Sequence, residues 1–532
     1  MSAAFVATLG AFCFAFAAAG CAPSSGPAAS AAHGEGLLPA RVRRLSNVEY
    51  ERTLEALLGK AVPVARALPP DVRQDGYTRN AAQAVPPGYG TRLSALVRDA
   101  VASAVGERLE ELLPCHPRSG DACRDAFVAD AAFRAFRRPV GASEKAALER
   151  LFDAGARGEA GFRGGVELVL RALLESPSLL YLRELGPAAP PGGVVTLGPY
   201  QVASSLSYFL RGAPPDAELY AAARRGELST GEGRERQARR LLGHSGTRHQ
   251  FRQFVMEWLE IDALDQAAKS ETLFPEFERL RPHMLAETRA FVDEVMVNEG
   301  ASLASLVDAG FAAVDPAMAR FYALDAYGAR VPARDRGRAG LLQQASFLSA
   351  HAHPDMTSPV KRGDFVLRRM LCIELPRPAE LDIEIVMPRP LARQTARERF
   401  IAHSADPSCR SCHALIDPLG YVFEGFDAMG KTRAIDAGKP LRTAADVAIR
   451  GERRYFADSA ALSAFLARNV EAKQCYLRQA FRFFSAQTDA DAERAFLEVV
   501  LALPDERRDN LLEALVAYVK SDLFARRKVP AP

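Results

Sequence analysis

Apolar residues recur at helical spacing along most of the chain. Residues 45–59, LSNVEYERTLEALLG, place their leucines and valine near one face of a helix. Ser46 stands three residues before Glu49, which is the signature of a capping box, and Gly59 follows as a helix end. The pattern therefore predicts a helix across this stretch.

The same periodicity returns further along the chain, whereas alternating strand patterns are few, at 194–198 and 446–451. Ser358 can cap one of the helices, with Pro359 in its first turn, and Ser143 is the expected cap of another. The sequence thus predicts a mainly α protein. The further helical patterns lie at residues 141–158, 161–181, 197–212, 358–372 and 509–524.

Proline- and glycine-rich stretches separate these helices into consecutive units. LGPAAPPGGVV at 185–195 and the proline-rich crossing at 374–392 are the clearest breaks. A chain of 532 residues also exceeds what one hydrophobic core usually supports. The expected helical units are 41–112, 113–186, 195–265, 270–435 and 436–532.

The first residues have a different character. Residues 1–20 contain no charged side chain, and a short apolar run that ends in small residues is typical of an export signal. Ala-Ala-Gly-Cys at 18–21 resembles a bacterial lipoprotein cleavage box, although no Lys or Arg precedes the apolar run; a plain secretory peptide and a membrane span are the alternatives. We expect a signal peptide over 1–20, lipidation of Cys21 and a flexible tether over 21–40. The protein would then lie in the periplasm or at the cell surface, anchored to a bacterial membrane.

Composition restricts the function classes. Hydrophobic residues make up 48% and charged residues 25% of the chain, as in an ordinary soluble domain. The formal charge is +3, from 68 basic and 65 acidic residues. A nucleic-acid partner would call for a much more basic surface, so we expect none.

The cysteines follow from the predicted export, because thiols pair or bind cofactors in an oxidising compartment. Cys115 and Cys123 are eight residues apart in a loop-like stretch and are expected to form a local disulfide. Cys372 and Cys475 then remain as a long-range pair. The alternative is four buried free thiols, since sequence alone does not fix connectivity.

The strongest chemical motif lies in SADPSCRSCHALIDPLG, residues 404–420. Cys409, Cys412 and His413 form a Cys-x-x-Cys-His pattern, which is typical of covalent c-type haem attachment. The two sulfurs bond the haem vinyl groups, and the histidine becomes the proximal iron ligand. Such haem is attached outside the cytoplasm, in agreement with the predicted export signal.

A Cys409–Cys412 disulfide and a zinc knuckle are the alternative interpretations. Zinc would need a fourth ligand, and the sequence contains no second Cys-x-x-Cys pair. A redox disulfide normally comes with a thioredoxin-like βαβ context, which the predicted elements lack. We therefore expect one covalent haem c, with 270–435 as the haem-bearing unit.

A proximal histidine needs its other ring nitrogen oriented by a backbone carbonyl or a carboxylate. The carbonyls near Asp417 and Pro418 are the expected partners of His413, and the Asp417 side chain alternatively caps the next turn. Lys361 and Arg362 are expected to pair with haem propionates, unless their segment is simply a solvated helix start. Candidates for the sixth iron ligand are His351, His353 and Met356, with Met429 and His403 as further possibilities.

The string SADPSCRSCHALIDPLGYVFEGFDAMGKTR resembles the haem segment of a family of uncharacterised multi-domain bacterial surface c-type cytochrome lipoproteins, whose consecutive domains are known only as domains of unknown function. The resemblance implies haem binding at Cys409, Cys412 and His413, and it supports the Cys372–Cys475 pairing. The closing unit departs from the family, with FFSAQT where a Gly-Arg pair is common. Further similar strings, in chain order, lie at 43–59, 135–144, 174–184, 197–219, 254–262, 340–372 and 475–484.

These features favour an exported haem-c lipoprotein that acts in electron transfer, or as a haem-dependent redox subunit, at the cell envelope with a redox partner protein. A chain of this length around one haem exceeds the single domain that a simple carrier needs. A haem-dependent oxidoreductase on a small or polymeric substrate is one alternative, and a non-enzymatic surface binding protein with structural haem is another. The resembled family has no established reaction, so the sequence indicates no catalytic residue and no substrate.

Overall fold

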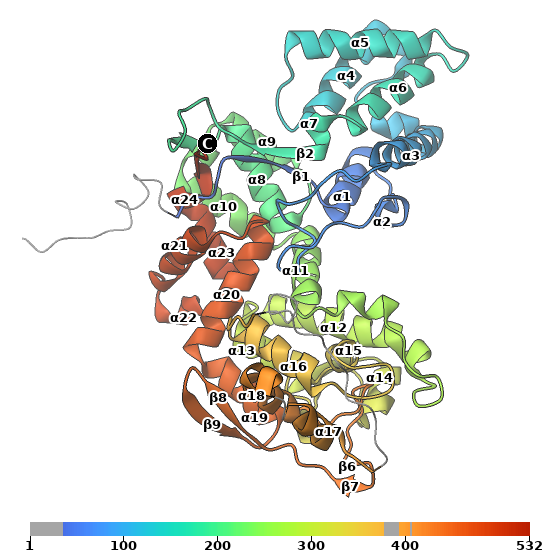
Figure 1. Cartoon of the computed structure of the whole chain (residues 1–532). Coiled ribbons are helices and arrows are strands. Elements are labelled where there is room, and N and C mark those ends of the chain that lie inside the picture. Colours follow the sequence, from blue (N-terminus) through green and yellow to red (C-terminus); the bar gives the residue numbers. More distant parts are fainter. Residues whose placement is uncertain (1–35, 377–392, 405–406, 532) are drawn as a thin grey trace, which may run out of the picture.

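The computed structural model describes residues 36–376, 393–404 and 407–531. Helices account for 59% and strands for 9%, which confirms the mainly α prediction. Figure 1 shows helices grouped above and below a central set, and the strands of the described residues form only two-stranded sheets. Within the described residues, no helix has the length and apolar character needed to cross a membrane. The expected signal peptide and Cys21 lie outside those residues.

The fold begins inside the segment assigned to the tether. Leu37 and Leu38 are buried, and the backbone of Leu38 accepts a hydrogen bond from Lys528 near the C-terminus. The last residues of the expected 21–40 tether therefore belong to the folded part, because their apolar side chains are covered.

Of the two predicted N-caps in the N-terminal part, the one at Ser46 is confirmed, and the one expected at Ser143 lies at Gly141 instead. The Ser46 hydroxyl accepts from the Glu49 amide, Glu49 accepts from the Ser46 amide, and Gly59 ends the helix at φ 66°. In the fifth helix the cap is Gly141 and not Ser143, because the Glu144 carboxylate accepts from the Gly141 amide at 2.8 Å. This part contains β1 (Arg41–Arg44), α1 (Asn47–Leu58), α2 (Val64–Ala67), α3 (Tyr89–Leu112), α4 (Asp121–Phe136), α5 (Ala142–Ala156), α6 (Phe162–Leu174), α7 (Pro177–Leu180) and β2 (Tyr181–Glu184).

The central helices pack against the C-terminal ones, so that distant parts of the chain share one core. Trp258 is fully buried and lies 5.8 Å from Phe254 and 5.1 Å from Tyr476, measured between ring centroids. The central elements are β3 (Val194–Thr196), α8 (Pro199–Arg211), α9 (Ala217–Arg224), α10 (Gly231–Leu242), α11 (Ser245–Trp258) and α12 (Phe277–Glu299). The closing elements are α20 (Val470–Ser485), α21 (Ala490–Leu501), α22 (Asp505–Arg508), α23 (Leu511–Lys520), α24 (Asp522–Ala525) and β10 (Arg526–Lys528).

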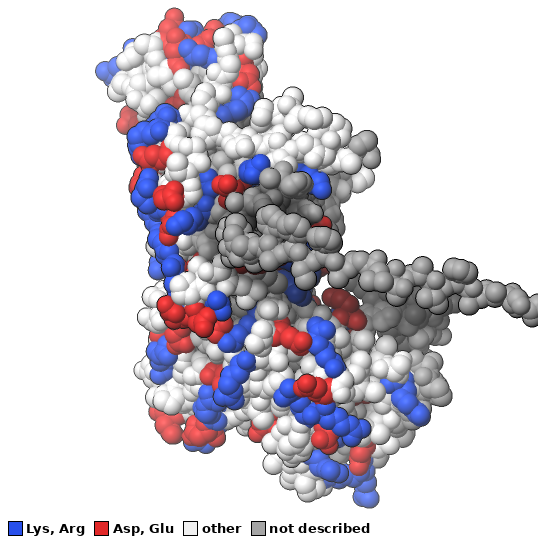
Figure 2. Space-filling view, turned by 90° about the vertical axis from the view of Figure 1, so that its left-hand side faces the viewer, with Lys and Arg blue, Asp and Glu red and all other residues white. Residues whose placement is uncertain are grey.

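The strand pairs tie chain ends to interior segments. β1 pairs antiparallel with β2 at the end of the N-terminal part, and β10 near the C-terminus pairs antiparallel with β3 at the start of the central part. The predicted strands at 194–198 and 446–451 are present as β3 and β8. Figure 2 shows basic and acidic side chains interspersed over the face it presents.

The motif-bearing part occupies the lower region of Figure 1. Ser358 caps α16 by accepting from the Lys361 amide, with Pro359 in the first turn, as the sequence predicts. The elements are α13 (Leu303–Val307), β4 (Phe311–Val314), α14 (Pro316–Tyr322), β5 (Gly328–Pro332), α15 (Ala345–Ala350), α16 (Pro359–Phe365), the π-helical turn η7 (Val366–Met370), α17 (Ala396–His403), α18 (Pro407–Tyr421), β6 (Ile435–Asp436), β7 (Lys439–Pro440), β8 (Ala445–Ile449), β9 (Glu452–Phe456) and α19 (Ser459–Arg468).

Two disulfides link segments of the described residues. Cys115 bonds Cys123 across eight residues, and Cys372 bonds Cys475 across 103 residues. These are the two pairings expected from the sequence. The second bridge joins the end of η7 to α20, and so it fixes the segment beside α18 to the C-terminal helices.

Candidate functional site

Cys409, Cys412 and His413 lie together on one helix, α18. Residues at positions i, i+3 and i+4 share a helix face, so the two thiols and the imidazole project from the same side. All three side chains are half-buried, and Cys412 packs against the hydrophobic core. The two sulfurs are not joined to each other in a disulfide.

The imidazole of His413 is oriented by a carboxylate one turn further along α18. Its Nδ1 lies 2.8 Å from Oδ1 of Asp417, whose side chain is almost fully buried. This hydrogen bond raises the pKa of His413 above its usual value, because the carboxylate favours the protonated ring. Since Nδ1 contacts the carboxylate, Nε2 is the ring nitrogen that would bind a metal.

The role of Asp417 differs from both sequence expectations. The side chain and not a nearby backbone carbonyl contacts His413, and Asp417 lies in the interior of α18 where it caps no further turn. The signal was present in the sequence, because a His and an Asp four residues apart on a helix are neighbours. Pro418 lies inside α18, which continues through it to Tyr421.

The α16 helix crosses α18 beside the motif. The two run in opposite directions at the contact, since Pro359 lies against Gly420 and Gly363 lies against Ile416. Beyond this crossing, η7 continues along α18 and contacts it as well. The structure therefore brings residues 359–370 next to the motif helix. This stretch includes Lys361 and Arg362 of the segment 351–362, for which contact with the haem stays a prediction.

The candidate distal residues His351, His353 and Met356 precede α16 and are placed differently from one another. His351 is buried, and its Nε2 contacts the Leu259 carbonyl oxygen at 2.9 Å; burial lowers its pKa to about 4. Met356 accepts a hydrogen bond at Sδ from the Arg399 guanidinium, 2.6 Å away. His353 is half-buried, and its backbone carbonyl accepts from Lys269. The described residues contain no group of three or more His, Cys, Asp or Glu side chains arranged to hold a metal.

The two expected propionate partners have different surroundings. Lys361 is exposed, its Nζ lies 3.5 Å from the Ala352 carbonyl oxygen, and partial desolvation of the ammonium group lowers its pKa. Arg362 is fully buried, and its guanidinium donates to the carbonyl oxygens of residues 348, 423 and 427. Nη1 and Nη2 of Arg362 thus bind backbone oxygens of the fold, whereas the expected pairing with a haem propionate stays a prediction. Arg362 instead fixes α16 to the loop after α18.

The two remaining sequence candidates lie near the same region. Met429 is buried in the core that contains α18, in the loop before β6. His403 ends α17, and its side chain lies outside the part that the structure describes.

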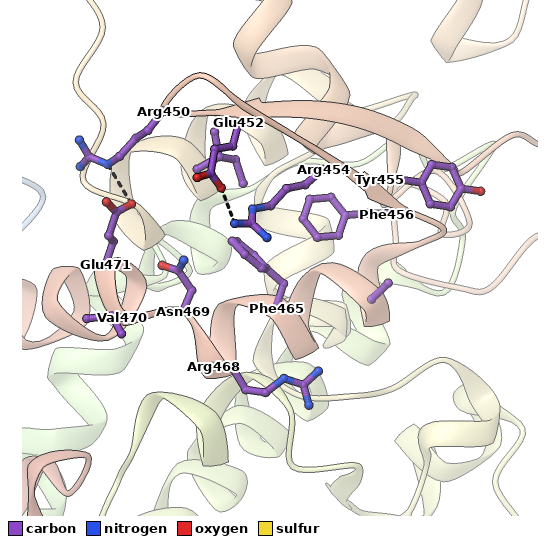
Figure 3. A pocket seen from close by; sticks show the side chains of 12 residues that line it. Arg450, Glu452, Arg454, Tyr455, Phe456, Phe465, Arg468, Asn469, Val470 and Glu471 are labelled. Atoms are coloured by element: carbon purple, nitrogen blue, oxygen red, sulfur yellow. Dashed lines mark hydrogen bonds and ion pairs between the residues drawn. The ribbon is translucent and has the colours of Figure 1, made fainter. Parts of the chain in front are cut away.

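A separate groove opens beside the β8–β9 hairpin. It has a volume of about 860 Å³ and is lined by β9 and by the α19–α20 junction (Figure 3). Its charges are largely paired, since Arg450 contacts Glu471 at 2.9 Å and Arg454 contacts Glu452 at 2.6 Å. The groove is open and contains no motif residue, so it does not belong to the candidate site.

The motif geometry fits the group that its pattern implies. Covalent haem attachment needs two cysteines one turn apart on an accessible face and a histidine beside the second cysteine. The chain supplies Cys409, Cys412 and His413 on one half-buried face of α18, with Asp417 holding Nδ1. A buried carboxylate behind a ligating imidazole is the common arrangement of metal-binding histidines.

Four family models match the chain in consecutive order, and each is described as a protein of unknown function. DUF1587 matches residues 43–106, DUF1595 matches 123–184, DUF1592 matches 197–324 and DUF1588 matches 338–436. The last match contains the Cys409–His413 motif, and its short name, PSCyt3, hints at a cytochrome-related family. No curated protein and no solved structure shows significant similarity to the chain. The matches are consistent with the resemblance to a multi-domain family of unknown function, while the cytochrome character and the unit boundaries stay predictions.

Proposed function

We propose that this chain of consecutive domains of unknown function carries one haem c, bound covalently through Cys409 and Cys412, with His413 as an axial ligand of the iron. One observation carries the proposal: the three side chains share a half-buried face of α18, and the imidazole is held by the buried Asp417 carboxylate. The match to PSCyt3 over the same residues supports it.

The proposed role is electron transfer, or a redox subunit function, at the bacterial cell envelope. Haem supplies one-electron redox chemistry when bound. The chain's own residues would do the rest: Cys409 and Cys412 tether the group, His413 binds through Nε2, and Asp417 keeps the Nδ1 proton in place. The apolar leader and Cys21 support export and lipid anchoring, and a redox partner protein is part of the proposal.

Covalent haem is tested in protein expressed in a host that matures c-type cytochromes. Denatured wild-type protein should retain peroxidase-active pigment on a gel and contain about one iron per chain. The Cys409→Ser/Cys412→Ser double variant should lose the pigment, whereas a Cys115→Ser/Cys123→Ser variant should keep it, because that pair forms a disulfide far from α18 in the sequence. Wild-type protein without pigment, or with zinc in place of iron, would refute the proposal.

A haem-dependent oxidoreductase is the second candidate function, favoured by a chain far larger than a simple carrier needs. The two are separated by adding carbon monoxide to the reduced protein. An electron-transfer centre with two protein ligands should keep its spectrum. A complete carbon monoxide shift would indicate an open iron position and would favour the oxidoreductase.

A further inference from the structure

We infer that Asp417 is a positioning residue that sets the reduction potential of the proposed haem by holding negative charge against the proximal imidazole. This inference rests on the proposed function and goes beyond it, because it states which oxidation state the protein favours. The structure assigns the role to Asp417 through three observations: its contact with His413, its burial, and the absence of a Lys or Arg ion-pair partner among the described residues.

The contact is short and well placed. Oδ1 of Asp417 lies 2.8 Å from Nδ1 of His413, and the two residues are one helical turn apart on α18. The helix backbone therefore fixes their separation, and no mobile loop is involved. An Nδ1–H donor that faces a carboxylate gives the ring partial imidazolate character, which strengthens its donation to a metal at Nε2.

Burial increases the effect of this charge. Only 3% of Asp417 is exposed, so water screens the carboxylate little and its field acts strongly on the adjacent ring. A backbone carbonyl in the same place would present a dipole and not a full charge. The identity of this one side chain therefore decides the electronic character of the proximal ligand.

Within the described part of the chain, no Lys or Arg side chain forms an ion pair with the Asp417 carboxylate. Across the residues that the structure describes, the only salt-bridge partner of Asp417 is His413 itself. Oδ2 lies 3.5 Å from the Tyr421 hydroxyl, a neutral group. The nearby Arg397 guanidinium stacks over the Tyr421 ring at 4.6 Å and donates to the carbonyl oxygens of residues 442 and 444. Its Nη1 group is thus directed to backbone oxygens.

The sign of the effect follows from charge. A more electron-rich imidazole stabilises the ferric state over the ferrous state, since the ferric iron carries one more positive charge. Asp417 therefore lowers the reduction potential and favours the oxidised protein. Removing the charge should raise the potential.

The experiment compares Asp417→Asn with a matched control. The substitution keeps the shape of the side chain and a hydrogen-bond acceptor but removes the charge. Asp364→Asn on the neighbouring α16 removes a carboxylate that pairs with Arg368 at 2.6 Å and does not contact His413. We expect Asp417→Asn to shift the ferric–ferrous equilibrium at least tenfold toward ferrous haem, about 59 mV for a one-electron couple. Asp364→Asn should change it less than twofold, and Asp417→Glu should restore most of the wild-type potential.

Covalent haem content is measured on the same samples by the pyridine haemochrome spectrum, so that failures are distinguishable. Haem attached with an unchanged potential in Asp417→Asn overturns this inference and leaves the proposed function standing. Wild-type protein without covalent haem overturns the proposed function and this inference with it. If Asp417→Asn does not fold by circular dichroism, Asp417→Ser is measured instead, and the same tenfold threshold applies.

Discussion

Gly420 of α18 touches the backbone of Pro359 in α16: a β-carbon at position 420 would lie 1.9 Å from the Pro359 carbonyl oxygen. At the other end of the crossing, a β-carbon on Gly363 would lie 2.0 Å from the Ile416 carbonyl oxygen. Two glycines, one on each helix, therefore allow the motif helix and the preceding helix to meet backbone to backbone.

We predict that Gly420→Ala separates the two helices and lowers the free energy of unfolding by about 3 kcal/mol or more, because the added methyl overlaps backbone that cannot rotate away. The control is Gly90→Ala in α3, where no atom lies within 4 Å of the added carbon. That substitution should be neutral or stabilising by up to about 1 kcal/mol. Denaturant unfolding of both variants checks the prediction, and equal stabilities would contradict it.

The two disulfides should contribute unequally. In the chain-entropy account a bridge stabilises more when it closes a longer loop, so Cys372→Ser/Cys475→Ser should cost about 4 to 5 kcal/mol. The Cys115–Cys123 bridge closes a loop of only eight residues, so Cys115→Ser/Cys123→Ser should cost about 2 to 3 kcal/mol. Unfolding in guanidinium under oxidising conditions measures both. A larger loss for the short bridge would show that the loop-length argument does not hold here.

Glu287 makes stability depend on pH in an unusual direction. It is buried in α12, its Oε2 accepts from the Tyr322 hydroxyl at 2.6 Å, and burial raises its pKa to about 8. The folded state therefore holds a proton on Glu287 at pH 7. In the unfolded chain the carboxyl group has its usual pKa of 4.5, so the proton is released above that pH. Because the folded state binds more protons in this window, stability falls as the pH rises from about 5 to 8, by at most about 1.4 kcal/mol per pH unit.

We predict that Glu287→Gln removes this slope and is more stable than the wild type at pH 8, since an amide needs no proton to stay neutral. Glu294→Gln, on the same helix at a position paired with Arg330, should keep the wild-type slope. Unfolding curves at pH 5, 6.5 and 8 give the comparison. A slope that survives in Glu287→Gln would mean that another group causes it.

Substitution of His351 tests whether this residue is the sixth ligand of the proposed haem iron. Its Nε2 contact with the Leu259 carbonyl, and its ring packing 4.5 Å from Phe347 and 4.9 Å from Phe365, indicate a structural role. We expect His351→Ala to cost about 2 to 3 kcal/mol of stability while leaving the visible spectrum of the haem protein unchanged. His353→Ala, at a half-buried position, should cost less than 1 kcal/mol. A changed spectrum in His351→Ala would identify it as an iron ligand instead.

Features that depend only on neighbouring residues could be predicted from the sequence without the fold. The helix cap at Ser46, the start of α16 at Ser358, the mainly α content and the Cys-x-x-Cys-His motif all depend on residues within one or two turns of one another. Both disulfide pairs were also expected, although by elimination and resemblance and not by geometry.

The hydrogen-bond partners of particular polar side chains could not be predicted from the sequence in this way. Arg362 was expected to meet haem propionates, yet its guanidinium binds carbonyls from residues 348, 423 and 427. His351 was a ligand candidate, yet it reaches the carbonyl of Leu259, 92 residues away. No sequence pattern reports such contacts, because they depend on which backbone groups the packing leaves nearby.

For this protein, the sequence alone determined which residues share a helix face, since helical periodicity is a property of neighbours in the chain. It thereby placed Cys409, Cys412 and His413 together. Only the tertiary structure decided that Asp417 is buried against His413, that α16 crosses α18 at two glycines, and that Arg362 belongs to the core. Those outcomes depend on desolvation and on close contact between segments far apart in the chain, and both arise only when the whole core has assembled.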